Sequence, residues 1–408
     1  MFRPFRSKTA DHSPAARVYL DYASATPVLP EVIQAMSHFW SEDFGNASAI
    51  HSEGVRAKTA LIHAREAVAK ILQVKPDGIT FTSGGTESNN LAIVGTIERV
   101  RTEGVPYSDM EIITTRLEHP ATLKTVAALE CKGVTVRYAP VDERGRIILA
   151  EFTELLSLRT RIVTVAYVNS EIGTIEDIGA LHRLIAAKRR EGGTAALLHV
   201  DAAQAPMWLP CELPRLGADL LSLDSGKFGG PKGVGILAHG KGVAVEAVVY
   251  GGGQEAGLRP GTEAVPLIVG CSTALEIVQA CWKERQEAVS RLRDDAIKAL
   301  QNAIPGLFLN GARGEERVAN NINISIPGLS SEFAVISLDV AGIACSTKSA
   351  CSAAGGGEST VVKAVTGDSA RAASTLRFTL GPDTTTAQIN QMIVVLKTHA
   401  ESQKSTIV

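Results

Sequence analysis

One lysine of this chain, Lys227, stands in a turn where its amine could act as a nucleophile. It follows the apolar run Leu220–Leu223, and small residues surround it in the sequence Asp224-Ser225-Gly226-Lys227-Phe228-Gly229-Gly230. A lysine amine that reaches from such a turn into a cleft can bond covalently to a carbonyl compound. Because a single lysine is usually a solvated surface residue, this interpretation requires a second functional group beside Lys227.

Asp201 is the candidate for that second group. It ends an apolar run 26 residues before Lys227, in the sequence His199-Val200-Asp201-Ala202-Ala203-Gln204. A carboxylate at the end of a buried strand needs a positive partner, and a protonated pyridine ring is one. The alternative is that Asp201 only caps a helix. The separation corresponds to one strand–helix–strand unit, which could place Asp201 and Lys227 on neighbouring strand ends.

A glycine-rich turn over residues 81–88 is a candidate phosphate site. Its sequence is Phe81-Thr82-Ser83-Gly84-Gly85-Thr86-Glu87-Ser88. Free N–H groups and the helix dipole both favour an anion where a helix begins. The turn has neither the lysine of a P-loop nor the spacing of a dinucleotide fold, so a purely structural turn is the alternative.

Cys351 is the candidate sulfur nucleophile. It lies in the segment SACSAAGGG (349–357), and Lys348 beside it favours the thiolate. A loop of this composition lets a nucleophile approach a substrate and leave again. The six cysteines form no C-x-x-C pair, which argues against a zinc site or a disulfide framework. Cys345 lies in an apolar run and is expected to be an inert thiol.

Apolar runs alternate with helical patterns in the first two thirds of the chain, which predicts an α/β domain with a mainly parallel seven-stranded sheet. Chemistry should then gather where the strands end. The expected strands are Ile79–Thr82, Glu111–Thr115, Val134–Tyr138, Ile162–Val168, Ala196–Val200, Leu220–Leu223 and Val234–Ala238. The expected helices between them are Glu87–Arg101, Ala121–Cys131 and Gly179–Arg190.

The pattern changes after Gly270, which predicts a second, smaller α+β domain. A charged helix is expected over Ala274–Ala303, followed by a half-buried strand within Val318–Ile326. We therefore expect a large domain over 27–273, a small domain formed by 18–26 and 274–408 that carries the cysteine loop, and an N-terminal extension over 1–17.

Nine motifs in order resemble one family. They are GNASAIH (45–51), TSGGTES (82–88), EH (118–119), VNSEIGTIEDI (168–178), HVDAAQA (199–205), the Lys227 loop, YGGGQEAGLRPGT (250–262), KSACSAAGGGESTVVKAV (348–365) and LRFTLG (376–381). Together they resemble the NifS/IscS-like cysteine desulfurases, in the class-V aminotransferase-like family of fold-type I enzymes that use pyridoxal 5'-phosphate (PLP). The likeness runs from about Val18 to the C-terminus.

The resemblance implies a role for each cofactor-site residue. Lys227 holds PLP covalently and later moves the α-proton of the substrate, and His119 stacks on the ring. The remaining cofactor contacts that it implies are Asp201 with the pyridine nitrogen, Gln204 with the ring hydroxyl, Gly85 and Thr86 with the phosphate, and Asn169 beside the ring.

The resemblance also implies a substrate site and a dimer. Arg377 and Asn169 are expected to hold the substrate carboxylate, because a guanidinium fork matches a carboxylate. Thr262 lies in the segment that reaches the phosphate of the neighbouring subunit, so a homodimer is expected.

The implied reaction converts L-cysteine to L-alanine and leaves the sulfur on Cys351 as a persulfide. The sulfur would then pass to an acceptor such as an iron–sulfur scaffold or a tRNA-thiolation protein, and Cys351 would contact the iron–sulfur cluster on such a scaffold. No resident metal is expected. The alternative is a selenocysteine lyase or another PLP β-lyase. A non-catalytic scaffold is disfavoured because Lys227 and Asp201 are both retained.

One motif departs from the family. The usual S-x-H-K is Asp224-Ser225-Gly226-Lys227 here, so a serine and a histidine near the phosphate are missing. A carboxylate facing a phosphate is repelled, so we expect Asp224 to turn away or to pair with a cation. Phosphate binding would then fall to Ser225, the Gly226 N–H, Thr86 and Thr262, with weaker retention of PLP.

The composition is that of an ordinary globular protein. The chain has 408 residues, of which 45% are hydrophobic and 21% charged, with a net charge of −2. This balance predicts no direct nucleic-acid or membrane binding. The basic segment 1–17 lacks an apolar core, so a cytoplasmic protein with a frayed extension is expected ahead of organelle import.

Overall fold

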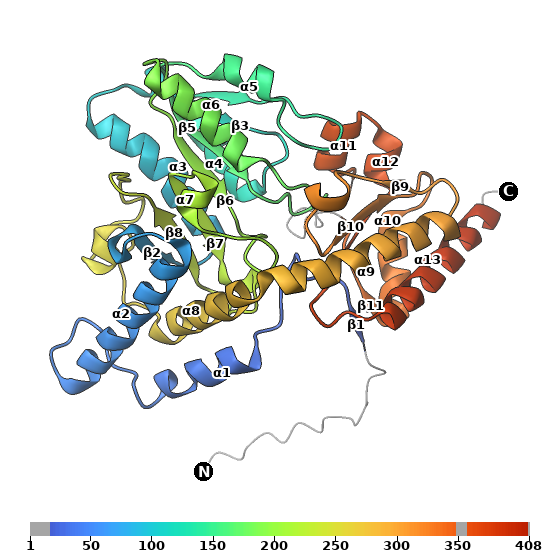
Figure 1. The fold of residues 1–408 in the computed structure, drawn as a ribbon, viewed down its shortest axis with the longest axis horizontal. Coiled ribbons are helices and arrows are strands. Elements are labelled where there is room, and N and C mark those ends of the chain that lie inside the picture. The colour runs from blue at the N-terminus through green and yellow to red at the C-terminus, as the bar shows by residue number, and fades with distance from the viewer. Residues whose placement is uncertain (1–16, 348–356, 407–408) are drawn as a thin grey trace, which may run out of the picture.

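The computed structural model describes residues 17–347 and 357–406. Lys348 and Cys351 therefore lie outside the described residues. Two groups of secondary structure lie side by side, with the first two thirds of the chain in one and the last third in the other (Figure 1).

A seven-stranded sheet forms the centre of the larger group. Its strand order is β2-β8-β7-β6-β5-β3-β4, and only β8 runs antiparallel to its neighbours. The strands are β2 (Ile79–Thr82), β3 (Glu111–Thr114), β4 (Thr135–Tyr138), β5 (Thr160–Ala166), β6 (Leu197–Asp201), β7 (Leu220–Asp224) and β8 (Gly235–His239). The predicted seven-stranded, mainly parallel sheet is thus confirmed, with strand ends displaced by two residues or fewer.

Helices bury both faces of this sheet. Ile112 and Ile162 join a core that includes α3 and α4, whereas their neighbours Ile113 and Val163 join the core that includes α6. Residues one position apart point to opposite faces of a strand, so both faces must be apolar, and the strands read as continuous apolar runs. The helices of this group are α1 (Pro30–Met36), α2 (Ser52–Leu72), α3 (Gly85–Thr102), α4 (Pro120–Glu130), α5 (Leu149–Leu155), α6 (Ile178–Arg190), α7 (Leu213–Leu216) and α8 (Val265–Ala280).

The smaller group is built on an antiparallel sheet in the order β12-β10-β9, with a parallel pair β1-β11 beside it. The strands are β1 (Val18–Tyr19), β9 (Phe308–Leu309), β10 (Asn321–Ser325), β11 (Ile343–Ala344) and β12 (Thr375–Thr379). The helices are α9 (Trp282–Ala303), α10 (Ser331–Val340), α11 (Thr360–Thr366), α12 (Ser369–Ala373) and α13 (Thr386–Thr406). The β1-β11 pairing links residues 18–19 to the last third of the chain.

The prediction of a single helix over Ala274–Ala303 is wrong, because two helices, α8 and α9, share this segment. The backbone of Cys281 leaves the helical region at φ −137° and ψ 31°, and α8 and α9 meet there at 68°. Helix α8 is apolar and packs on α2, whereas α9 is charged and contacts α13. Among the described residues, no single helix combines the length and apolar character that a membrane span needs.

Candidate active site

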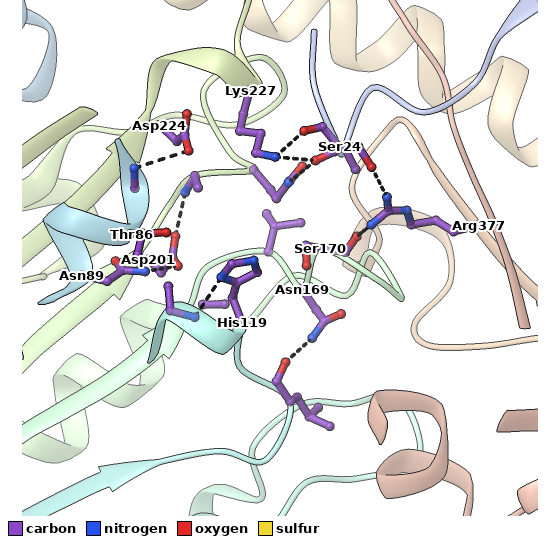
Figure 2. A pocket seen from close by; sticks show the side chains of 18 residues that line it. Ser24, Thr86, Asn89, His119, Asn169, Ser170, Asp201, Asp224, Lys227 and Arg377 are labelled. Atoms are coloured by element: carbon purple, nitrogen blue, oxygen red, sulfur yellow. Dashed lines mark hydrogen bonds between the residues drawn. The ribbon is translucent and has the colours of Figure 1, made fainter. Parts of the chain in front are cut away.

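A pocket opens where β5, β6 and β7 end, because parallel strands present their carboxyl ends at the same edge of a sheet. Asp201 is the last residue of β6, and Asp224 is the last residue of β7. A short 3₁₀ turn, Ser225–Lys227, carries Lys227 on from β7. Ser24 and Arg377, from the two ends of the chain, complete the lining (Figure 2).

The Lys227 amine points into this pocket and is held by backbone carbonyls. Its Nζ donates to the oxygens of Ala23 at 3.1 Å and Ser24 at 2.5 Å. Gln204 binds the same segment, since its Nε2 donates to the oxygen of Ala23 at 2.9 Å. The segment after β1 therefore positions two of the residues that the sequence assigned to the cofactor.

The Asp201 carboxylate is fixed by two donors. Asn89 Nδ2 donates to Oδ2 at 2.6 Å, and the Ala203 N–H donates to Oδ1 at 3.0 Å. Asn89 lies on α3 and also lines the pocket. Sequence reasoning missed Asn89, although it directly follows the TSGGTES motif, one helical turn after Gly85.

His119 lies in the loop between β3 and α4 and is the N-cap of α4. Its Nδ1 accepts a hydrogen bond from the Ala121 N–H at 3.1 Å. Burial lowers the pKa of His119, and Lys227 lowers it further, while Asp201 acts in the opposite direction. The imidazole is thus held neutral in the pocket wall, which suits a ring that packs against a flat ligand.

Two buried titratable groups lie near Asp201. Burial raises the pKa of Glu118 to about 8, and the nearby Asp201 charge adds to the increase. Glu118 accepts hydrogen bonds from the Thr115 hydroxyl at 2.7 Å and the Ala166 N–H at 2.8 Å. Burial lowers the pKa of His199 to about 3. Both groups are therefore neutral at pH 7, and Asp201 is the acidic group that lines the pocket at this end.

Arg377 presents a buried guanidinium to the other end of the pocket. Its Nη1 donates to the Ser170 oxygen at 2.9 Å. Its Nη2 donates to Asp21 Oδ1 at 2.9 Å and Ser24 Oγ at 2.7 Å. Its Nε is buried and, within the described part of the chain, has no hydrogen-bond partner. Asp21 and Ser24 were not predicted, and they belong to Leu20-Asp21-Tyr22-Ala23-Ser24, to which no motif assigned a role.

Asn169 lines the same end, but its side chain is already engaged by its own loop. Its Nδ2 donates to the Leu117 oxygen at 2.9 Å. Its Oδ1 accepts from the N–H groups of Glu171 at 2.9 Å and Ile172 at 3.0 Å. Asn169 therefore shapes the wall of the pocket and fixes the loop whose Ser170 carbonyl holds Arg377.

The sequence predicted that Asp224 turns away from the phosphate or pairs with a cation. In the structure its side chain instead points at the start of α3. Its Oδ2 accepts from the Gly85 N–H at 3.3 Å and its Oδ1 from the Gly226 N–H at 3.0 Å (Figure 2). No ion pair joins Asp224 to a lysine or arginine among the described residues. Both N–H donors lie within reach because Gly85 and Gly226 have no side chains to keep the carboxylate away.

Of three other residues expected to contact the cofactor, Thr86 lines the pocket and Ser225 and Thr262 do not. Thr86 lines the pocket at the start of α3. Ser225 is buried with its hydroxyl against Gly230, where an added Cβ would lie 2.0 Å from Oγ, and it does not line the pocket. Thr262 is exposed and is also absent from the lining.

Comparisons with known proteins identify the family of this chain. The model of the family described as "Aminotransferase class-V" matches residues 18–392. This chain belongs to that family.

Relatives from two organisms cover nearly the whole chain. It is 39% identical over 380 residues to "Cysteine desulfurase IscS" of Dictyoglomus turgidum, covering 93% of each protein. It is 37% identical over 378 residues to "Cysteine desulfurase IscS 1" of Archaeoglobus fulgidus, covering 93% of this chain and 95% of the relative. The resemblance predicted from the nine motifs is confirmed.

Two solved structures share the fold. A NifS-like protein has a TM-score of 0.85 and 33% identity, over 94% of this chain and 98% of that one. A structure titled "SspA in complex with cysteine" has a TM-score of 0.76 and 30% identity, over 90% of this chain and 99% of that one.

Class-V aminotransferases use PLP, and the ring end of this pocket fits that cofactor. An aspartate fixed by Asn89 suits a pyridine nitrogen, a neutral His119 suits the ring face, and the Lys227 amine suits the aldehyde carbon. The phosphate end fits less simply, because the Gly85 N–H at the start of α3 already serves Asp224.

Proposed function

We propose that this chain is a PLP-dependent cysteine desulfurase that converts L-cysteine to L-alanine and leaves the sulfur on Cys351 as a persulfide. The observation that carries the proposal is the meeting of Lys227, Asp201, His119 and Arg377 in one pocket. The names of the relatives and the cysteine complex of a similar structure support cysteine as the substrate.

Bound PLP supplies an electron sink that stabilises negative charge at the substrate's α-carbon. The chain's own residues then divide the remaining work. Asp201, oriented by Asn89, holds a proton on the pyridine nitrogen. His119 packs its neutral ring against the cofactor face. The Lys227 amine, held near Ala23 and Ser24, is the base that moves the α-proton of cysteine.

Arg377 orients the substrate through its carboxylate. The guanidinium is already held by Asp21, Ser24 and the Ser170 carbonyl, so its plane is fixed before the substrate arrives. A fixed donor loses little conformational entropy on binding. Asn169 contributes indirectly, by fixing the loop that carries Ser170.

In the sulfur-transfer step, the Cys351 thiolate attacks the sulfur of the substrate. A sulfur–sulfur bond forms and the substrate's carbon–sulfur bond breaks, with its electron pair left on carbon. Protonation of that carbon leads to alanine, and Cys351 keeps the sulfur as a persulfide until an acceptor thiol removes it. Such an acceptor, for example an iron–sulfur scaffold protein, is part of the proposal.

The decisive test compares wild type with Cys351→Ser for alanine and sulfide production from cysteine in the presence of a reductant. We expect the variant to bind PLP and to change its cofactor absorbance with cysteine, yet to release little alanine. Cys345→Ser is the matched control, because burial raises the pKa of the Cys345 thiol to about 12 and keeps it unreactive. Near-normal alanine release by Cys351→Ser would favour a lyase that does not use Cys351.

A homodimer is also part of the proposal. Large apolar side chains of the α1–α2 region are exposed, by 57% at Ile33, 60% at Trp40, 66% at Phe44 and 98% at Ile50. Such a surface favours burial against a second subunit. Thr262 is exposed outside its own pocket, as a residue that serves a partner's phosphate site would be. Sedimentation should give twice the 43.0 kDa chain mass, and an active monomer would contradict this part.

A further inference from the structure

The phosphate end of the pocket contains an acid of the chain itself at the place where a phosphate would bind. Helix α3 begins at Gly85, and the first N–H groups of a helix have no acceptor within that helix. Here the Gly85 N–H donates to Asp224 Oδ2 at 3.3 Å. The fit is close, since a Cβ on Gly85 would lie 3.2 Å from the Asp224 Cβ.

The loop that carries Asp224 is built to hold it in this position. Asp224 Oδ1 accepts from the Gly226 N–H at 3.0 Å, so the carboxylate bridges its own loop and α3. A Cβ at position 226 would lie 3.4 Å from Asp224 Oδ1 and 3.3 Å from Lys232 Cγ. Glycine at 226 therefore leaves room for the carboxylate, whereas a larger residue there would crowd it.

We infer that Asp224 competes with the cofactor phosphate for the N–H groups at the start of α3, so that PLP binds by displacing this carboxylate. The inference rests on the proposed function, because it takes PLP as the ligand of this pocket. A phosphate and a carboxylate cannot both accept from the Gly85 N–H. Two anions close enough to share one donor also repel each other. Asp224 is therefore a specificity-determining residue that weakens the contribution of the phosphate to PLP affinity.

Competition predicts opposite effects on the protein with and without PLP. Asp224 caps the Ser225–Lys227 turn and accepts from the first N–H of α3, so its removal should lower the melting temperature of the full chain stripped of PLP. The same change removes the competitor, so the rise in melting temperature on adding PLP should grow, since a tighter ligand stabilises more. A residue with only a structural role would lower stability without increasing that rise.

The experiment titrates wild type, Asp224→Ala and Asp224→Asn with PLP and, separately, with pyridoxal, which has no phosphate. We expect Asp224→Ala to bind PLP at least about tenfold more tightly. Asp224→Asn, which keeps the shape but not the charge, should show a smaller gain and serves if the alanine variant does not fold. Pyridoxal should bind all three proteins equally.

Asp177→Ala is the matched control. Asp177 caps α6 by accepting from the Ala180 N–H at 2.9 Å and does not line the pocket, so its loss should lower stability and leave PLP affinity unchanged. The inference is overturned if both Asp224 variants bind PLP no more tightly than wild type, or if pyridoxal gains as much as PLP. Failure of wild type and every variant to bind either compound would instead refute the proposed function.

Discussion

The two ends of the pocket are organised in different ways. At the ring end, Asp201, His119 and Lys227 each have partners that orient them toward the pocket, namely Asn89, the Ala121 N–H and the carbonyls of residues 23 and 24. At the phosphate end, the N–H groups of Gly85 and Gly226 are bonded to Asp224.

The difference shows which part of the site the proposed chemistry requires. Proton transfer and charge stabilisation depend on the position of individual atoms, and each residue at the ring end has a fixed support. Phosphate binding contributes affinity, which several donors can share, so this end tolerates a change of residue type. Four substitutions test this difference between the two ends.

The largest effect is expected for Lys227→Ala. Removal of a positioned acid–base group costs about 10²–10⁴-fold in rate, and the covalent link to PLP is lost with it. The measurement is alanine release together with the near-visible absorbance of the cofactor. Lys232→Ala is the control and should keep that absorbance. If Lys232→Ala loses the absorbance instead, then Lys232 and not Lys227 holds PLP.

The second change is Asn89→Leu at the ring end. It removes the 2.6 Å hydrogen bond to Asp201, and a bond to a charged group contributes about 1.5–3 kcal/mol, which corresponds to roughly 10–150-fold in rate. We expect kcat to fall while the KM for cysteine changes little, because Arg377 is untouched. A change in KM alone would place Asn89 at the substrate and not behind the cofactor.

The third change is Glu118→Gln, behind the ring end. The pKa of Glu118 is raised from 4.5 to about 8, so the folded protein keeps this proton where the unfolded chain has released it. Wild type should therefore lose stability, of the order of 5 kcal/mol, as the pH rises from about 4.5 to about 8. In urea unfolding from pH 5 to pH 9, the free energy of unfolding of the variant should fall less with pH than that of wild type. An equal fall in both proteins would contradict this prediction.

The smallest effect is expected for Thr86→Val at the phosphate end. It removes one hydroxyl with little change of shape, and one neutral hydrogen bond contributes about 1 kcal/mol, or about fivefold in PLP affinity. Alanine release at saturating PLP should stay near that of wild type. A large fall in kcat would show that the two ends are coupled more tightly than their contacts indicate.

Much of the scaffold could be predicted because it follows from local pattern. Strands buried on both faces read as apolar runs, so β2 to β8 were found within two residues. The break between α8 and α9 was missed because no proline or glycine marks Cys281. What separates these helices is their environment, since α8 packs on α2 and α9 on α13.

Residue types and apolar runs are local properties, so the chemical groups of the chain and the runs that carry Asp201 and Lys227 could be recognised from the sequence, whereas the adjacency of β6 and β7 comes from the folded sheet. Only the tertiary structure decided how those groups are held. Arg377 meets Asp21 across 356 positions of the chain, and Asn89 meets Asp201 across 112. Asp224 was expected to avoid the phosphate end, yet it bonds to Gly85, 139 positions away. The physical reason is that an unpaired helix N–H and a nearby carboxylate find each other in space, which no local pattern records.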